Sequence, residues 1–245
     1  VPEWEEVRTN LAQYYERKSE RERTFTFLES VITSNALTID YILREEATEL
    51  FDYPEELIPH NSRELSREDL EILMKARMIV RARLSQATLT GRESIVFMVR
   101  FVEALRSLNN GVVQDAVSHT LWGTEQWKRC VENPRKNIME RQLQWEILDE
   151  GGRVWIHTHG MLKFGLPDLE MEGFPAEAAG TGRKLMIMAA ERLVQQRGRG
   201  LNLASPMVLP GTPFAFAAEV RPRDEEGHFP AGSLGILPHV ACHDP

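Results

Sequence analysis

Residues 143–159 read LQWEILDEGGRVWIHTH, and they form two runs of apolar and polar residues around a Gly-Gly pair. In the first run, residues 143–147, the apolar residues fall at every second position, which is typical of a strand with one buried face. Turn-forming residues follow at 149–152, and residues 154–159 return as a second, more apolar run. The pattern predicts a β-hairpin.

Helical and strand patterns alternate on both sides of this hairpin. Residues 92–107 and 183–196 are rich in apolar residues over helical lengths, and they predict two buried helices. Residues 78–84 and 214–220 alternate as half-buried strands do. Because helices and strands are interleaved, the sequence predicts an α+β fold with a mixed or antiparallel sheet packed with two buried helices.

The first 60 residues differ from the rest of the chain in charge. They contain 14 acidic and six basic side chains, whereas the remaining residues are balanced. Residues 3–22 have an apolar stripe at helical spacing, and residues 24–27 fit either a strand or a continued helix. We therefore expect an acidic helical N-terminal arm over residues 1–60 and an α+β globular domain over residues 61–245.

Further helix signals occur between the arm and the hairpin. Ser66 is a preferred N-cap residue with acidic residues behind it, which predicts a short helix that ends near Lys75. Residues 122–131 fit another helix. The buried helix over 92–107 ends at an Asn-Asn-Gly turn, so a domain boundary near Asn109 is the alternative to the one after residue 60.

The charge and the hydropathy limit the classes of partner. A net charge of −8 argues against a nucleic-acid binder and against docking on anionic lipid. The longest unbroken apolar stretch, Leu185–Ala190, is far shorter than the roughly 20 residues of a membrane helix. Residues 45–56 contain six carboxylates and no basic residue. This run predicts a solvated face, or else the surface that binds a basic protein partner.

Cys130 and Cys242 are the two cysteines of the sequence. Two thiols without a signal-peptide pattern indicate a reducing compartment, so we expect a cytoplasmic protein.

The strongest chemical signal is the pair His157 and His159. Residues i and i+2 of a strand project to the same face, so the two imidazoles point together, as ligands of one metal ion must. A zinc site of the catalytic type needs a third protein ligand, for which Asp168 and Glu170 are the candidates. The alternative is a hydrogen-bonded layer beside Trp155 with no metal.

The C-terminal segment His239–His243 offers a second source of zinc ligands. It contains two histidines and Cys242 within five residues. Its other interpretation is an ordinary polar terminus.

The histidine segment resembles the core of the JAMM metallo-isopeptidases, whose pattern is His-Ser/Thr-His, seven residues, Ser, two residues and Asp. Here His157-Thr158-His159 is followed at the same spacing by Pro167 and Glu170, which replace the Ser and the Asp. The resemblance implies a metal held by the two histidines and a carboxylate. It also implies an upstream glutamate as general base, for which Glu93 and Glu103 have the right separation.

A wider resemblance involves three segments, which begin at Gly111-Val112-Val113, at Trp155 and at Phe164. Together they are similar to bacterial proteins of unknown function that share a Gly-Val-Val-x-Asp, a Trp-x-His-Thr-His-Gly-Met and a Phe-Gly-Leu-Pro-Asp-Leu-Glu pattern. This resemblance implies a bacterial origin and implies no activity.

No complete catalytic constellation is visible in the sequence. We therefore expect a non-catalytic binding or interaction module of a cytosolic protein, which binds a protein partner and no cofactor. The alternative is a zinc-dependent hydrolase. In that case His157 and His159 are ligands, Asp168 or Glu170 is the third ligand, and water is the nucleophile.

Overall fold

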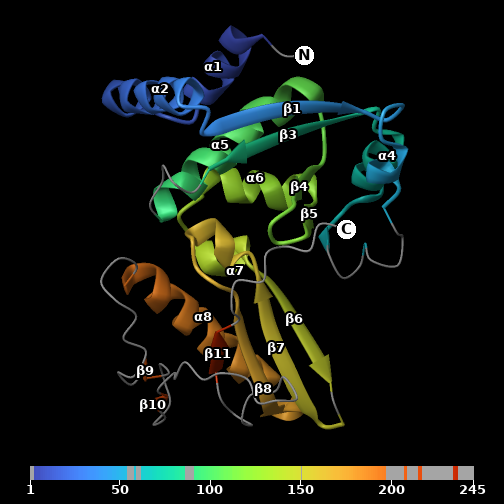
Figure 1. The fold of residues 1–245 in the computed structure, drawn as a ribbon, viewed down its shortest axis with the longest axis vertical. Helices are drawn as coiled ribbons and strands as arrows, with labels where there is room; N and C mark the ends of the chain where they lie inside the picture. Colours follow the sequence, from blue (N-terminus) through green and yellow to red (C-terminus); the bar gives the residue numbers. More distant parts are fainter. Residues whose placement is uncertain are drawn as a thin grey trace. The chain divides into compact units, whose positions relative to one another are not determined.

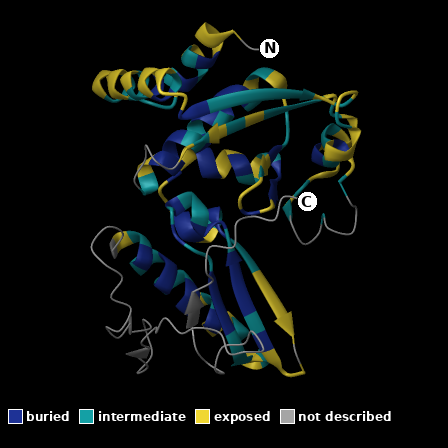
Figure 2. Cartoon of the chain, in the orientation of Figure 1, coloured by how far each residue is buried: buried dark blue, intermediate teal, exposed yellow. Residues whose placement is uncertain are grey.

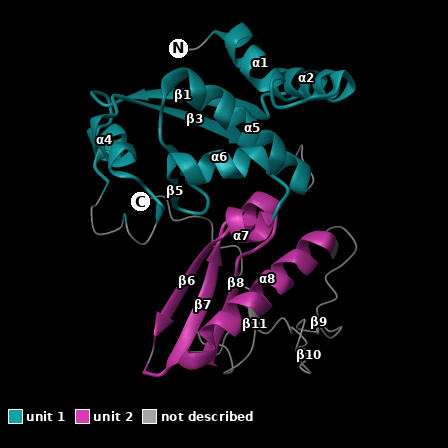
Figure 3. Ribbon diagram, turned by 180° about the vertical axis from the view of Figure 1, so that it is seen from behind, with its two compact units in different colours: residues 1–136 teal, residues 137–245 magenta. Residues whose placement is uncertain are grey.

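The computed structural model describes residues 3–53, 58, 62–85, 91–149, 151–196, 207–208, 215–216 and 234–236. The chain divides into two compact units, residues 1–136 and residues 137–245 (Figures 1 and 3). The boundary expected after residue 60 lies inside unit 1, because a strand before it pairs with a strand after it along seven residues.

Unit 1 combines helices with two small sheets. In order, its elements are α1 (Trp4–Ala12), α2 (Lys18–Thr33), β1 (Leu37–Leu43), η1 (Thr48–Phe51), β2 (Ser62–Arg63), α4 (Arg67–Lys75), β3 (Met78–Leu84), α5 (Arg92–Asn109), β4 (Val113–Asp115), β5 (Thr120–Trp122) and α6 (Thr124–Glu132). Strands β1 and β3 are antiparallel. In the other sheet, β2 pairs with β5 in parallel and β4 pairs with β5 antiparallel.

The N-terminal residues form two helices where the sequence predicted one over residues 3–22. Helix α1 ends at Ala12, and α2 begins at Lys18 and continues through residues 24–27. The strand reading of residues 24–27 is therefore wrong, and the continued helix is confirmed. Residues 18–23 and 28–33 are helical on both sides of this short alternation, and cooperative helix formation extends the helix through it.

The core of unit 1 lies around α5, most of whose apolar residues are buried. Leu11 and Phe101 are completely buried, and Leu28 and Val31 of α2 pack into the same cluster. Helix α5 ends at Asn109, and the following residue, Asn110, adopts a left-handed conformation, as the Asn-Asn-Gly signal indicated.

Helix α4 begins where its cap predicts. The Ser66 hydroxyl accepts a hydrogen bond from the Asp69 backbone N–H at 3.0 Å, and the Asp69 carboxylate accepts one from the Ser66 N–H at 2.9 Å. This reciprocal pair is a capping box. Asp69 also accepts a hydrogen bond from the Thr124 hydroxyl, so the start of α4 is tied to the start of α6.

Unit 2 is built on a four-stranded antiparallel sheet in the order β11-β8-β7-β6. Its elements are α7 (Ile138–Gln142), β6 (Gln144–Asp149), β7 (Arg153–His159), η4 (Met161–Phe164), β8 (Leu169–Pro175), η5 (Ala176–Ala178), α8 (Ala179–Gln196), β9 (Met207–Val208), β10 (Ala215–Phe216) and β11 (Leu234–Ile236). The predicted hairpin is confirmed as β6 and β7. Gln144 pairs with His159 at one end of the ladder, and Asp149 pairs with Val154 at the other.

Helix α8 covers one face of this sheet. Gly182 of α8 lies so close to the sheet that an added Cβ would be 2.7 Å from Cδ1 of Ile156. Ile156 and its neighbours Val154 and Thr158 therefore face the helix and are buried. His157 and His159 project to the opposite face. Figure 2 shows that β6 is the exposed strand of the hairpin and β7 the buried one.

The fold class is α+β, with antiparallel and mixed sheets, as predicted. The two predicted buried helices are α5 and α8. Of the strand expected over 214–220, residues 215–216 lie within the described part of the chain and form β10. No described helix is long and apolar enough to span a membrane.

Candidate metal centre

The register of the hairpin brings three potential metal ligands together. Glu146 of β6 lies directly opposite His157 of β7, and His159 follows two residues later on the same face. The Nε2 atoms of the two histidines are 3.0 Å apart. Oε2 of Glu146 lies 2.8 Å from Nε2 of His157 and 3.3 Å from Nε2 of His159.

These distances suit a single bound cation. Three atoms with spacings of 2.8–3.3 Å leave a point that is about 2 Å from each, which is the length of a Zn–N or Zn–O bond. A neutral imidazole carries one proton and offers one lone pair, and a carboxylate offers only lone pairs. When both Nε2 atoms are unprotonated, three lone pairs converge, as the ligands of one cation would; when one Nε2 carries a proton, the same atoms form hydrogen bonds instead.

The site is buried at one corner and open at the other two. The His157 side chain is 10% exposed, that of His159 35% and that of Glu146 48%. Solvent therefore reaches the cluster from the side of Glu146 and His159, where β6 is the exposed strand (Figure 2). An ion held by these three atoms would have its remaining coordination positions on this open side.

Burial and mutual charge keep the cluster ready to bind a cation. Burial lowers the pKa of His157 below its ordinary value, the charge of His159 lowers it further, and Glu146 opposes the shift only in part. Partial burial raises the pKa of Glu146, but the hydrogen bond with His159 and the charges of both imidazoles outweigh it and leave this pKa lowered. His157 is therefore neutral and Glu146 ionised at neutral pH, as metal binding requires.

The second nitrogen of His157 is also buried. Nδ1 forms no hydrogen bond within the part of the chain that the structure describes. The ring lies against Trp155, with ring centroids 4.8 Å apart, and edge-on to His159 at 4.7 Å. Packing between rings therefore fixes the orientation of His157.

Asp168 and Glu170, the third ligands expected from the sequence, lie outside this group of three. Oδ1 of Asp168 accepts hydrogen bonds from the Thr158 hydroxyl and from the Met161 N–H, both at 3.0 Å. Asp168 thus holds the turn between β7 and β8. Glu170 is completely buried on β8, opposite His157 in the register. Pro167 lies in the turn that precedes this strand.

Glu146 takes the place that sequence reasoning gave to Asp168 or Glu170. The sequence contained the information that places Glu146 beside His157. A turn that pairs Asp149 with Val154 also pairs Glu146 with His157, because the sum of paired residue numbers is constant in an antiparallel ladder. The register of the hairpin, rather than spacing along one strand, identifies the third member of the cluster.

The two glutamates considered as a general base already have partners in unit 1. The carboxylate of Glu93 pairs with the Arg135 guanidinium at 2.6 Å. That of Glu103 accepts hydrogen bonds from Arg106 at 2.6 Å and from the Trp127 indole N–H at 2.7 Å. The ligands considered in the segment His239–His243 lie outside the described residues.

The hairpin segment also has a counterpart among known families. A family model described as "Protein of unknown function (DUF4026) C-terminal" matches residues 144–208, which begin with β6. No curated protein and no solved structure matches the chain. Residues 144–208 are thus similar to a family of unknown function, as the sequence resemblance indicated.

Proposed function

We propose that unit 2 binds a divalent transition-metal ion, zinc in the first place, and uses it for hydrolysis. The observation that supports this function is the convergence of Glu146, His157 and His159 within 3.3 Å of one another. Two imidazoles and one carboxylate are a ligand set typical of zinc enzymes, and three protein ligands leave a position for water or substrate.

Each side chain has a separate role in this proposal. His157, buried and held against Trp155, fixes the position of the ion. Glu146 supplies a negative charge that reduces the net charge of the site and is already ionised. His159, more exposed, completes the triangle next to solvent. An ion bound there supplies Lewis-acid chemistry, which polarises the bond to be hydrolysed.

Elemental analysis of the purified, untagged protein tests the metal site. We expect about one zinc per chain in the native protein, and a loss of the zinc in the double variant His157→Ala/His159→Ala. The matched control is His119→Gln, because His119 is an exposed histidine of unit 1. Equal metal content in the native protein and the double variant, or no metal after dialysis against zinc, would contradict the site.

Hydrolysis is tested separately, after the metal content is known. The zinc-loaded protein and the double variant are compared on a panel of ester, amide and phosphoester substrates. Turnover by the zinc-loaded protein alone supports the enzyme. If the protein binds zinc but hydrolyses none of the three substrate classes, the proposed metal site stands and the proposed hydrolase activity is contradicted.

A second candidate function, binding of a protein partner, has its own observation in unit 1. Three apolar side chains are exposed near Arg44: Leu43 by 38%, Leu50 by 52% and Met74 by 44%. The Arg44 guanidinium donates hydrogen bonds to the backbone carbonyls of Met74 and Phe51 and so connects their segments. The exposed carboxylates of the same region are Glu45, Glu46, Glu49 and Asp52. Apolar side chains within an acidic rim fit a partner that is basic and partly apolar.

The substitution Leu50→Asp tests this surface. We expect a protein captured by the native chain to be lost from this variant and retained by Val117→Asp, which changes an apolar side chain of similar exposure elsewhere in unit 1. Equal capture by the native protein, Leu50→Asp and Val117→Asp would contradict a role for the apolar residues near Arg44 in binding a partner.

A further inference from the structure

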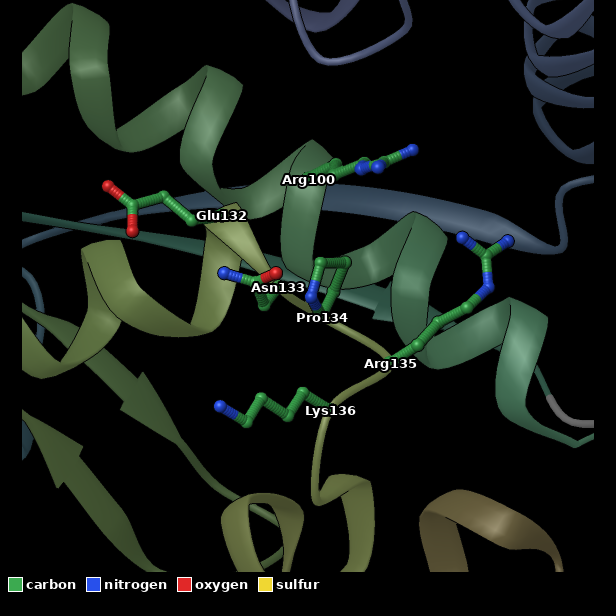
Figure 4. A pocket seen from close by; sticks show the side chains of 6 residues that line it. All are labelled: Arg100, Glu132, Asn133, Pro134, Arg135 and Lys136. Carbon is green, nitrogen blue, oxygen red and sulfur yellow. The ribbon is translucent and has the colours of Figure 1, made fainter.

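A second charged cluster lies in unit 1, where α2, α5 and residues 133–136 enclose two adjoining hollows. The first has a volume of about 430 Å³ and is shown in Figure 4. The second has a volume of about 380 Å³. Arg100 of α5 and Arg135 line both hollows, and in Figure 4 their guanidinium groups extend to the same side. We call the second hollow, which Arg23 of α2 also lines, the arginine groove.

The three arginines differ in how their charges are satisfied. Arg135 forms a two-point ion pair with Glu93, at 2.6 and 3.2 Å. Nε of Arg23 donates to the backbone carbonyl of Ser19. Arg100 forms no ion pair or hydrogen bond with any residue that the structure describes, although its Nε is buried. Arg100 is only half-buried as a residue, and its guanidinium lines the groove without an anionic partner among the described residues, so its donors are available to an anion.

Acidic side chains do not neutralise the groove. Glu93 is engaged by Arg135, and Glu20 is the other carboxylate in the lining. The three arginines therefore exceed the acids by one charge. The lining of the adjoining hollow contains Arg100, Arg135 and Lys136 and one carboxylate, that of Glu132.

The remaining wall of the arginine groove is aromatic. Tyr15, Phe27 and Phe97 line it. The rings of Phe27 and Phe97 form an edge-to-face pair with centroids 4.9 Å apart, and the Arg100 guanidinium lies 4.4 Å from the centre of the Tyr15 ring. Aromatic walls bind flat or apolar groups, and stacking on Tyr15 holds Arg100 in an extended position.

From this combination we propose that the arginine groove binds a small organic anion, a phosphate or carboxylate attached to an aromatic or apolar body. Arg100 is the anchor, because its guanidinium has donors to spare and can bind two oxygens of either anion at once. A volume of about 380 Å³ lies within the range of small-molecule sites.

Titration of the full chain with simple probes tests the proposal. Phenyl phosphate, benzoate, inorganic phosphate and phenol are added separately, and binding is followed by calorimetry and by backbone amide shifts of α2 and α5. We expect phenyl phosphate or benzoate to bind with a Kd below about 1 mM, and the tighter of the two identifies the anion. Phosphate and phenol should each bind at least about tenfold more weakly, since each lacks half of the ligand.

Variants locate the binding. Arg100→Gln should weaken the better ligand by about tenfold or more, because a charge-assisted hydrogen-bond pair is lost. The control Arg67→Gln, whose side chain is 94% exposed on α4, should leave binding unchanged. If Arg100→Gln does not fold, Arg100→Lys keeps the charge without the two-point contact and should still weaken binding. No saturable binding by the native chain, or equal binding by the native chain and the Arg100 variant, would overturn the proposal.

Discussion

The two units each contain a glutamate surrounded by nitrogen atoms, and the two surroundings differ in one respect. In unit 1 the carboxylate of Glu103 accepts hydrogen bonds from the Arg106 guanidinium and from the Trp127 indole N–H. In unit 2 the carboxylate of Glu146 meets the Nε2 atoms of His157 and His159, which carry a proton only in one tautomer or when charged. In unit 1 the carboxylate oxygens of Glu103 always face N–H donors. In unit 2 the carboxylate of Glu146 and both Nε2 atoms can all be acceptors at once.

The two clusters also differ in exposure, which bears on the proposed role of each. Around Glu103 both charged side chains are almost fully buried, 9% and 11% exposed, and the cluster is complete without any added group. The unit 2 cluster is open to solvent at Glu146 and His159, and under the proposed function it holds a cation. Loss of a residue should therefore cost stability in unit 1 and cation affinity in unit 2.

The largest effect is expected at Glu103. Replacement by Ala leaves the buried Arg106 guanidinium without its anion and the Trp127 N–H without its acceptor, which should cost about 3–5 kcal/mol of unfolding free energy. Chemical denaturation measures this loss. The exposed pair of Lys18 and Glu22 is the control, since Glu22→Ala should change stability little. A Glu103 variant as stable as the control would make the cluster dispensable.

The pH dependence of unit 2 is expected to be smaller and has a definite sign. In the metal-free fold the pKa of His157 is lowered, mainly by burial, below the unfolded value of about 6.5. As the pH falls from about 6.5 through this lowered pKa, the unfolded chain binds more protons and stability decreases. The lowered pKa of Glu146 extends the loss in the same direction at more acidic pH.

Hydrogen exchange of the β7 amides in the presence of a chelator measures this dependence. Protection should fall as the pH is lowered from about 7 to about 5, after correction for intrinsic exchange rates. His157→Gln should flatten the upper part of the curve. Protection that increases on acidification would contradict the assigned sign.

The smallest effect is expected at the cap of α4, where one side-chain hydrogen bond is removed. Ser66→Ala removes the hydroxyl that accepts from the Asp69 N–H and should cost about 1 kcal/mol. Ser66→Thr keeps the acceptor and should restore most of the stability. Equal unfolding midpoints for the Ala and Thr variants would show that the cap contributes nothing.

The parts of the fold that local patterns encode could be predicted from the sequence. The β6–β7 hairpin has a Gly-Gly turn and clear alternation, and α4 has its capping box within four residues. Strand β1 was missed because its support is distant. Residues 37–43 pair with β3, about 40 positions later, where Asp40 meets Arg81 and Arg83.

The candidate site was predicted in part for the same reason. The two histidines lie two residues apart on one strand, so their convergence follows from strand geometry alone. Glu146 belongs to the next strand, and its place depends on the register. Asp168 was a candidate because it is close in sequence and acidic, and its carboxylate accepts hydrogen bonds from Thr158 and Met161 in the turn after β7. Nearness in sequence did not distinguish a ligand from a turn-forming residue.

Zinc affinity of two acid-to-amide variants tests the central claim most directly. Glu146→Gln removes a ligand and should weaken zinc binding more than about 100-fold, since even the loss of an outer-sphere partner costs 10–100-fold. Asp168→Asn keeps an oxygen for Thr158 and Met161 and should bind zinc as the native chain does. Competition with a chromophoric chelator gives both values. The reverse order, with affinity lost in Asp168→Asn and kept in Glu146→Gln, would contradict the centre formed by Glu146, His157 and His159.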